Sequence, residues 1–472
     1  MGRTKLGRLL RSVALAAGVM TPGIWAGTAQ ADNLADAMVG AYNTSGLLEQ
    51  NRALLRAADE DVAIAVSALR PIIDWSIQLQ RAFQDRRSNG IPFDDQQSSL
   101  GGFIGFEQLL YDGGSAAFNK QAAQEQVLAT RQTLINVEQT VLERAATAYL
   151  NVLFQEENVQ LRINNVRVLG EELRASQDRF EVGEVTRTDV ALSESRLAAA
   201  RANLSDAEGQ LLIAQAEYQN AVGKRITRTQ GQPRIPRLPA SVDEAIALAN
   251  RNHPQILSAQ HQVKAENLNV ESVRATLGPS AFLLGNVGVV EDLDNTDFDN
   301  TGNISLELRQ RLYNGGGRTA QVRRALAVRD STRANLLNVQ RNVRQGVQNA
   351  YSTFQTAGAN LAASTERVRA AQIAFDGVRE EATLGARTTL DVLTSEQDLL
   401  DAQTAEIFSR VERSLAAYQL LRAQGLLTAE RLGLPVQIYD PTLYYNLVKD
   451  APVQSSKRGK DLERVLEALG KK

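Results

Sequence analysis

The chain contains the same sequence pattern twice, and this duplication is the feature that most restricts how it can fold. Leu110-Tyr111-Asp112-Gly113-Gly114 reappears 202 residues later as Leu312-Tyr313-Asn314-Gly315-Gly316. The offset holds without a gap for over eighty residues and relates the pairs Arg131 and Arg333, Ala148-Tyr149 and Ala350-Tyr351, Gly183 and Gly385, Asp189-Val190 and Asp391-Val392, and Ser193-Glu194 and Ser395-Glu396. A register of this length indicates one duplicated structural unit whose two copies share one geometry.

The duplication extends upstream at a slightly different offset. Pro71 matches Pro279 at a separation of 208 residues, so a change of six residues lies between Pro71 and Leu110. Length changes between repeats usually lie in exposed loops. We therefore expect a loop there, over the polar residues 84–98.

The N-terminus has the features of a secretory signal peptide, residues 1–31. Basic residues precede a short apolar run from Val13 to Val19, and Ala29-Gln30-Ala31 supplies a small-x-small cleavage site. We expect an exported protein whose mature chain begins at Asp32. No later stretch approaches the twenty or so apolar residues of a transmembrane helix. The chain has no cysteine, which excludes disulfides and a lipid-modified N-terminal cysteine.

Composition favours long helices. Basic and acidic residues are interspersed at a formal net charge of −2, which argues against a nucleic acid partner. Aromatic residues make up only 5% of the chain, and alanine, glutamine and leucine dominate. No proline occurs from Phe93 to Gln232 or from Ser280 to Leu434.

Both proline-free spans carry apolar residues at every seventh position. These positions are Ala145, Val152, Val159, Val166, Leu173 and Phe180 in the first copy, and Val347, Phe354, Leu361, Val368, Phe375 and Ala382 in the second. A seven-residue repeat imposes left-handed supercoiling on packed helices. A second stripe beside the first implies neighbours on two sides, as in a bundle or cylinder of helices. A soluble two-stranded coiled coil is the alternative.

Two segment pairs between the helices have the alternation of β-strands. They occupy residues 72–111 and 280–313, and each strand of about nine to eleven residues suits a tilted transmembrane strand. A soluble hairpin has the same alternation, but the signal recurs at matching places in both copies. Four strands cannot close a barrel, and an open edge is not tolerated in lipid. Three chains would supply twelve strands and room for a lumen, so we expect a trimer.

These features together resemble the TolC-type outer-membrane efflux proteins, the outer membrane factors of tripartite efflux and type I secretion systems. The resemblance covers roughly residues 33–435, and its most specific part is the turn Arg179-Phe180-Glu181-Val182-Gly183. It implies a mainly α protomer with a tandem repeat, a helical barrel of long coiled-coil helices, and four strands contributed to a shared trimeric 12-stranded β-barrel. It also implies a passive exit duct in the outer membrane of a Gram-negative bacterium, extending into the periplasm. The implied partners are a homotrimer, a periplasmic adaptor (membrane fusion) protein, an inner-membrane efflux pump or ABC secretion transporter, and outer-membrane lipid.

The resemblance also implies roles for residues at the two helical hairpin turns. The adaptor would dock at Val182-Gly183-Glu184 and at Leu384-Gly385-Ala386, although the glycines could serve only to reverse the chain. Asp391 would line the pore constriction, with Thr394 one turn later where relatives often have a second aspartate; an acidic ring of this kind favours cations. Capping of a helix N-terminus is the alternative for Asp391.

An entrance latch is the last role that the resemblance implies. Arg387 would hold the entrance shut through polar links, and Asp189 near the partner turn could pair with it between neighbouring hairpins. An exposed ion pair contributes about 1 kcal/mol at most, so a solvated pair without a gating role is the alternative.

We expect the following organisation of the chain. The predicted units are a signal peptide at 1–31, a first repeat at 32–222 with helices 115–182 and 186–222, a linker at 223–240, a second repeat at 241–434 with helices 242–277, 317–383 and 388–432, and a polar tail at 435–472.

Nothing in the sequence indicates an enzyme, a cofactor or a metal site. His253 and His261 are the only histidines, and Gly315-Gly316-Gly317 lacks the lysine and hydroxyl residue of a phosphate-binding loop. The alternative function is a periplasmic coiled-coil adaptor or scaffold without a pore. The duplicated strand pair argues against it.

Overall fold

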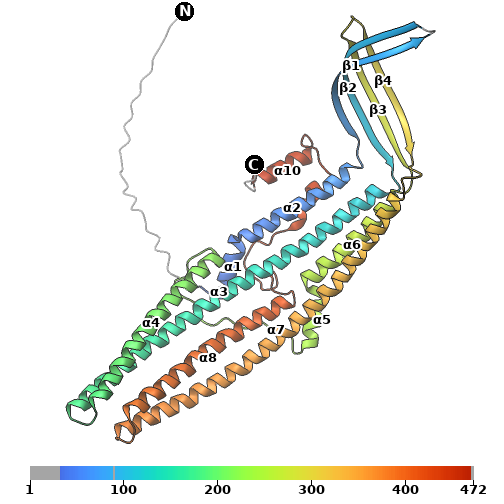
Figure 1. Ribbon diagram of the computed structural model, residues 1–472. Coiled ribbons are helices and arrows are strands. Elements are labelled where there is room, and N and C mark those ends of the chain that lie inside the picture. The colour runs from blue at the N-terminus through green and yellow to red at the C-terminus, as the bar shows by residue number, and fades with distance from the viewer. Residues whose placement is uncertain (1–31, 89–90, 469–472) are drawn as a thin grey trace, which may run out of the picture.

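The computed structural model describes residues 32–88 and 91–468, so the predicted signal peptide lies outside the described residues. An elongated stack of helices carries a four-stranded sheet at one end (Figure 1). The first copy consists of α1 (Leu34–Thr44), α2 (Gly46–Ser67), β1 (Ile72–Ser88), β2 (Ile91–Tyr111), α3 (Ser115–Glu181) and α4 (Arg187–Val222). The second copy and the tail consist of α5 (Val242–Asn252), α6 (Pro254–Ala275), β3 (Ser280–Asp292), β4 (Phe298–Arg309), α7 (Gly317–Thr383), α8 (Thr389–Ala423), α9 (Pro441–Val448) and α10 (Lys457–Ala468).

The two copies match element by element. Helices α1 and α5 each have 11 residues, α2 and α6 each have 22, and α3 and α7 each have 67. The repeat in the sequence is therefore a repeat in the structure. This mainly helical, duplicated protomer with four antiparallel strands confirms the predicted fold class.

The opening helix of each copy is broken, whereas the sequence predicted one helix over 242–277. His253 is extended, with φ −69° and ψ 121°, and α6 begins at Pro254. Proline lacks the N–H for an internal helical bond and disfavours helical backbone in the residue before it. The first copy breaks at the matching Ser45, whose side chain accepts from the N–H of Leu48 at 3.3 Å. Two short helices therefore replace one.

The four strands form one antiparallel sheet in the order β1-β2-β3-β4. The contact between β2 and β3 joins the two copies, and β1 and β4 are the edges. Paired residues share a face, so the register assigns one face to apolar side chains. This face carries Ile73, Trp75, Ile77, Leu79, Ile104, Val287, Val289, Ile304 and Leu306. The opposite face is mainly polar.

The predicted loop over residues 84–98 is wrong, because both strands of the first pair continue through it. Pairing of β1 with β2 runs from Ile72 opposite Glu107 to Ser88 opposite Ile91. These strands have 17 and 21 residues, against 13 and 12 for β3 and β4. Backbone pairing does not depend on apolar side chains, so polar residues can extend the hairpin. In the second pair, residues 293–297 connect β3 to β4.

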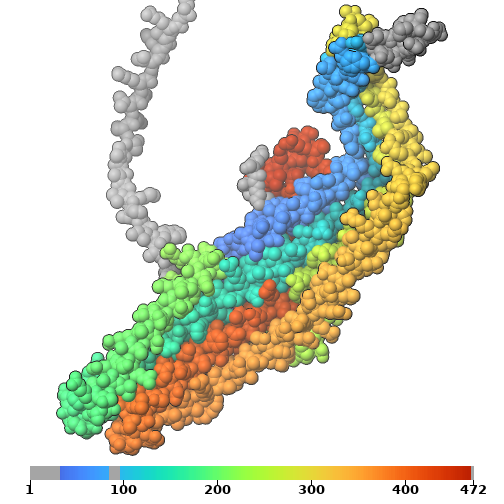
Figure 2. All heavy atoms as spheres, viewed as in Figure 1, coloured from blue at the N-terminus to red at the C-terminus, as the bar shows by residue number. Residues whose placement is uncertain are grey.

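The main core surrounds the middle of α3. Tyr149 of α3 and Tyr218 of α4 are fully buried there, against residues from α1, α8 and the segment 426–434. The long helix α3 has 18 buried residues, whereas α7, of equal length, has six. Helix α3 is therefore central in the chain, and α7 lies at its edge, as the space-filling view also shows (Figure 2).

The C-terminal part of the second copy differs from the prediction. Helix α8 ends at Ala423 rather than at 432, because Gly425 adopts a left-handed conformation with φ +76°. A Cβ atom on Gly425 would lie 2.6 Å from the Cα of His253, so only glycine fits this close approach. The predicted polar tail contains two helices, and α9 packs on α2 through a bond of 2.7 Å from Tyr444 to Glu60.

Candidate functional site at the helical tips

The two long hairpins, α3–α4 and α7–α8, reverse direction at the end of the molecule far from the sheet (Figures 1 and 2). Both turns use a glycine in the left-handed conformation, Gly183 with φ +82° and Gly385 with φ +77°. Matching backbone bonds close the helices before them. The N–H of Glu184 donates to the backbone carbonyl of Arg179 at 2.9 Å, and the N–H of Ala386 donates to the backbone carbonyl of Glu381 at 2.9 Å. The glycines are therefore required for chain reversal.

Both turns present an apolar side chain to solvent. Val182 is 71% exposed and Leu384 is 78% exposed. The predicted docking residues Gly183, Glu184, Gly385 and Ala386 are exposed beside them. Exposed apolar side chains surrounded by polar residues are typical of protein interaction sites.

Asp189 and Asp391 have the same structural role. Thr186 is the N-cap residue of α4. Its N–H donates to the Asp189 carboxylate at 2.9 Å, and the Asp189 N–H donates back to the threonine hydroxyl at 3.3 Å. Thr388 and Asp391 repeat this capping box with distances of 3.0 and 3.2 Å. The helix-capping alternative for Asp391 is thus observed in both copies.

The capping bonds set the charge of both aspartates. Backbone and side-chain hydrogen bonds from Thr388 lower the pKa of Asp391, and side-chain and backbone bonds from Thr186 lower that of Asp189. Both carboxylates are therefore ionised at neutral pH. Thr394 is exposed one turn after Asp391, and its hydroxyl donates to the Leu390 carbonyl at 2.8 Å.

Arg387 binds a partner other than the predicted one. Its Nε lies 2.7 Å from Oε2 of Glu381, on the same hairpin. Among the described residues of this chain, Asp189 forms no ion pair with Arg387. The predicted latch is therefore not formed within one protomer.

A buried polar contact behind the tips escaped the sequence analysis. Glu396 of α8 is 7% exposed and accepts a hydrogen bond from Asn165 of α3, which is 5% exposed. Burial raises the pKa of Glu396. The duplicated sequence could not indicate this burial, because the matching residue of the first copy, Glu194, is exposed. The contact instead joins the two hairpins, as does the ion pair of 3.3 Å between Arg379 and Glu172.

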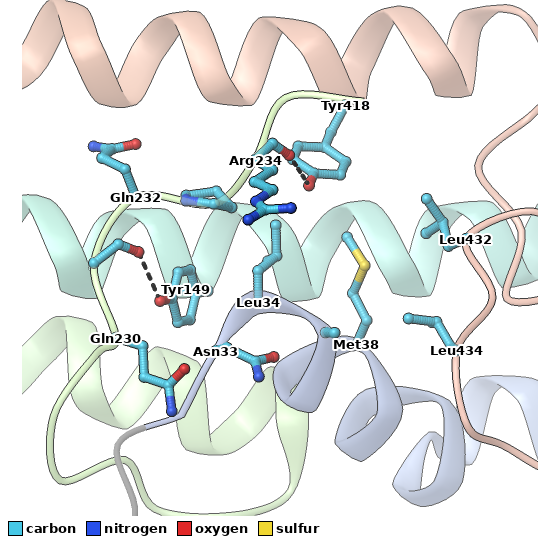
Figure 3. A pocket seen from close by; sticks show the side chains of 13 residues that line it. Asn33, Leu34, Met38, Tyr149, Gln230, Gln232, Arg234, Tyr418, Leu432 and Leu434 are labelled. Carbon is cyan, nitrogen blue, oxygen red and sulfur yellow. Dashed lines mark hydrogen bonds between the residues drawn. The ribbon is translucent and has the colours of Figure 1, made fainter. Parts of the chain in front are cut away.

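A hollow of about 470 Å³ lies at the middle of the molecule, where the linker between the copies crosses the helices (Figure 3). Tyr149 and Tyr418 point toward the linker and donate to the carbonyls of Gly231 at 2.9 Å and Arg234 at 3.3 Å. Burial raises the pKa of Tyr149 to about 12, so its hydroxyl remains a donor. The matching Tyr351 donates to Ala240 at 2.8 Å. These bonds anchor the linker.

Both histidines have structural roles. His253 caps α6 by accepting from the N–H of Gln255 at 3.3 Å, and Nδ1 of His261 lies 2.7 Å from Glu125.

Within residues 32–88 and 91–468, no group of three or more His, Cys, Asp or Glu could hold a metal ion. In the same residues, no helix is long and apolar enough to cross a membrane.

The duplicated hairpins and the sheet with one exposed apolar face define the protomer of a channel protein. The family model described as "Outer membrane efflux protein" matches residues 41–224 and 245–426, one span in each copy. The chain therefore belongs to the outer membrane efflux protein family.

Individual relatives agree with this assignment. The outer membrane efflux protein BepC of Brucella suis is 36% identical, over 89% of this chain and 91% of BepC. The outer membrane protein TolC of Vibrio cholerae is 25% identical, over 89% of this chain and 95% of TolC. The structure of the Campylobacter jejuni CmeC outer membrane channel superposes with a TM-score of 0.75 at 16% identity, covering 96% of this chain and 99% of CmeC.

Family membership confirms the predicted resemblance, function and location. The protein is an outer-membrane efflux channel of tripartite efflux or type I secretion systems, it extends into the periplasm, and it is not an enzyme. The alternative of a periplasmic scaffold without a pore is excluded.

Proposed function

We propose that three copies of this chain assemble into a passive exit duct, each contributing four strands to one 12-stranded barrel. The observation that carries the proposal is the open sheet. Strands β1 and β4 both lack an outer neighbour within the described chain. Trp75 on β1 is 74% exposed and Ile304 on β4 is 84% exposed. Pairing β1 of one copy with β4 of the next removes both edges and places the apolar face against lipid.

The helices support the same assembly. Along α7, Leu337 is 55% exposed and Ile373 is 60% exposed, although both belong to a helix with a heptad pattern. A neighbouring protomer would cover these side chains and close the helical barrel. The duct needs no energy source of its own, so an inner-membrane pump or ABC transporter would drive export.

We place the constriction at Asp391, one per protomer. Because its hydrogen bonds keep the carboxylate charged, three copies at one level would form a ring that favours cations. The latch between Arg387 and Asp189 would form between hairpins of neighbouring protomers. The adaptor would dock at the exposed turns, through Val182 and Leu384.

Single-channel recording of the purified protein in planar bilayers tests the duct and the ring together. Asp391→Asn removes the charge and keeps a capping oxygen, and Asp189→Asn is the matched control in the other copy. We expect a cation-preferring pore whose preference falls in Asp391→Asn and persists in Asp189→Asn. An equal response of both variants would contradict the proposed ring of Asp391 carboxylates. Bilayer-inserted protein without conductance would exclude the duct.

A further inference from the structure

The polar face of the sheet carries an aromatic side chain in its middle rows. Phe103 of β2 pairs with Ser76 of β1 and with Gly288 of β3, and Gly288 pairs with Thr301 of β4. Paired residues of antiparallel strands point to the same side. The half-buried Phe103 therefore shares a face of the sheet with Ser76 and Thr301, whereas Trp75 and Ile77 lie on the other face.

Two glycines keep the Phe103 ring flat against the sheet. A Cβ atom on Gly101 would lie 2.5 Å from Cε2 of the ring, and a Cβ atom on Gly288 would overlap Cδ1. The ring therefore fills the space of two absent Cβ atoms on adjacent strands. Close approach to both positions lays the ring along the sheet, which leaves one π-face turned away from the strands.

A carboxylate lies beside the ring on the same face. The Asp74 side chain covers Gly105, where a Cβ atom would lie 2.5 Å from Oδ1 of the aspartate. Gly105 is two residues from Phe103 along β2, a spacing of roughly 7 Å. The other ionisable residues near these rows, Glu107 and Asp299, are also acidic. This part of the face therefore combines an open aromatic surface with negative charge.

We propose that Phe103 and Asp74 form a binding site for aromatic organic cations in the lumen of the exit barrel. The inference rests on the proposed trimer, in which the polar face lines the lumen and the site occurs three times. An aromatic face attracts a cation through its quadrupole, and a nearby carboxylate adds Coulomb attraction. Gly101 and Gly288 serve the site, because a larger residue at either position would displace the ring from the wall.

Block of single-channel current by benzyltrimethylammonium, added on the side of the strand hairpins, tests the site. We expect the half-blocking concentration to rise about two- to fivefold in Phe103→Leu, which keeps an apolar side chain of similar size without a π-face. Asp74→Asn should weaken block to a comparable extent. Gly288→Ala should weaken it through displacement of the ring.

Two controls make the result specific. Gly302→Ala adds a Cβ at 3.7 Å from Val287, an ordinary contact on the apolar face, and should leave block unchanged. Benzenesulfonate has a similar ring and the opposite charge, and should block weakly. Wild-type channels that benzyltrimethylammonium does not block, block that persists in both Phe103→Leu and Asp74→Asn, or equal block by benzenesulfonate would each overturn the site while leaving the duct intact. Inserted protein without conductance would overturn the duct and the site together.

Discussion

At the scale of single residues, Asp59 on α2 is the least expected group in the protein. Its side chain is fully buried, as are those of Leu55 and Val62 one turn away on α2, and no described residue donates a hydrogen bond to either carboxylate oxygen. Burial raises its pKa to about 7, although the charge of Arg131 opposes the shift. An uncompensated buried carboxylate destabilises the folded state when it ionises.

We predict that Asp59 makes the protein less stable as the pH rises. The folded-state pKa of about 7 lies above the value of about 3.9 for an unfolded aspartate. Folding therefore takes up a proton. The stabilisation that comes from this proton uptake is complete below about pH 4 and is lost as the pH rises through 7. Asp59→Asn should raise the free energy of unfolding by about 1–3 kcal/mol at pH 8 and change it little at pH 4.

Thermal unfolding in detergent at both pH values measures this effect. The matched control is Asp61→Asn, two residues away on the exposed face of α2, which should leave the stability unchanged at both pH values. Equal stabilisation by Asp59→Asn at pH 4 and pH 8 would show that the carboxyl is not the titrating group.

Single-residue prediction from sequence succeeds where the cause is local. Capping, the alternative role that the sequence offered for Asp391, is observed with Thr388 because both partners lie within one turn. Prediction fails for Glu396, whose burial depends on Asn165, 231 residues away. Within this chain Arg387 contacts Glu381, a partner that the sequence alone did not indicate, because hairpin geometry decides which acidic side chain lies near it.

At the scale of elements, the glycine turns should control the hairpins. We predict that Gly385→Ala lowers the free energy of unfolding by about 1 kcal/mol, because φ +77° is strained for a residue with a Cβ. Gly377→Ala, within α7 and with open space around it, should instead raise stability by about 0.5–1 kcal/mol.

Hydrogen exchange at the α7–α8 turn gives the measurement for this pair. Gly385→Ala should increase exchange there, and Gly377→Ala should reduce it in the neighbouring part of α7. If both variants shifted exchange in the same direction, backbone conformation would not be the cause.

The boundaries of elements were predictable only where a residue enforces them. Gly183 and Gly385 end helices α3 and α7 within one residue of the predicted positions. The prediction of one helix over 242–277 overlooked the break that Pro254 enforces, and the strands through residues 84–98 were missed because polar side chains tolerate pairing.

At the scale of the whole molecule, the exposed apolar residues of α7 should hold the trimer together. We predict that Ile373→Glu weakens trimer assembly at least tenfold, because it would bury a charge between protomers. Leu443→Glu, at a residue of α9 with a similar exposed fraction, is the control and should leave assembly unchanged. Sedimentation in detergent across a concentration series reports the trimer fraction, and an unaltered trimer in Ile373→Glu would place the protomer contact elsewhere.

The exposed tips should determine coupling to the export machinery. We predict that the double variant Val182→Ser and Leu384→Ser reduces efflux in cells severalfold, because it removes the apolar contacts of both turns. Its conductance in bilayers should equal that of the wild type, since neither side chain belongs to the proposed constriction at Asp391. Normal efflux by the variant would exclude docking through these side chains.

The sequence by itself determined the duplication, the long helices, the glycine turns and the helix caps. Each depends on periodicity or on contacts within a few residues, and each pattern occurs in both copies of the repeat. Only the tertiary structure decided which copy of the long helix is central, where Glu396 and Asp59 are buried, and how Phe103 lies on its glycines. The two copies share one local pattern but have different neighbours. Burial and partner choice follow from those long-range contacts, which no local pattern encodes.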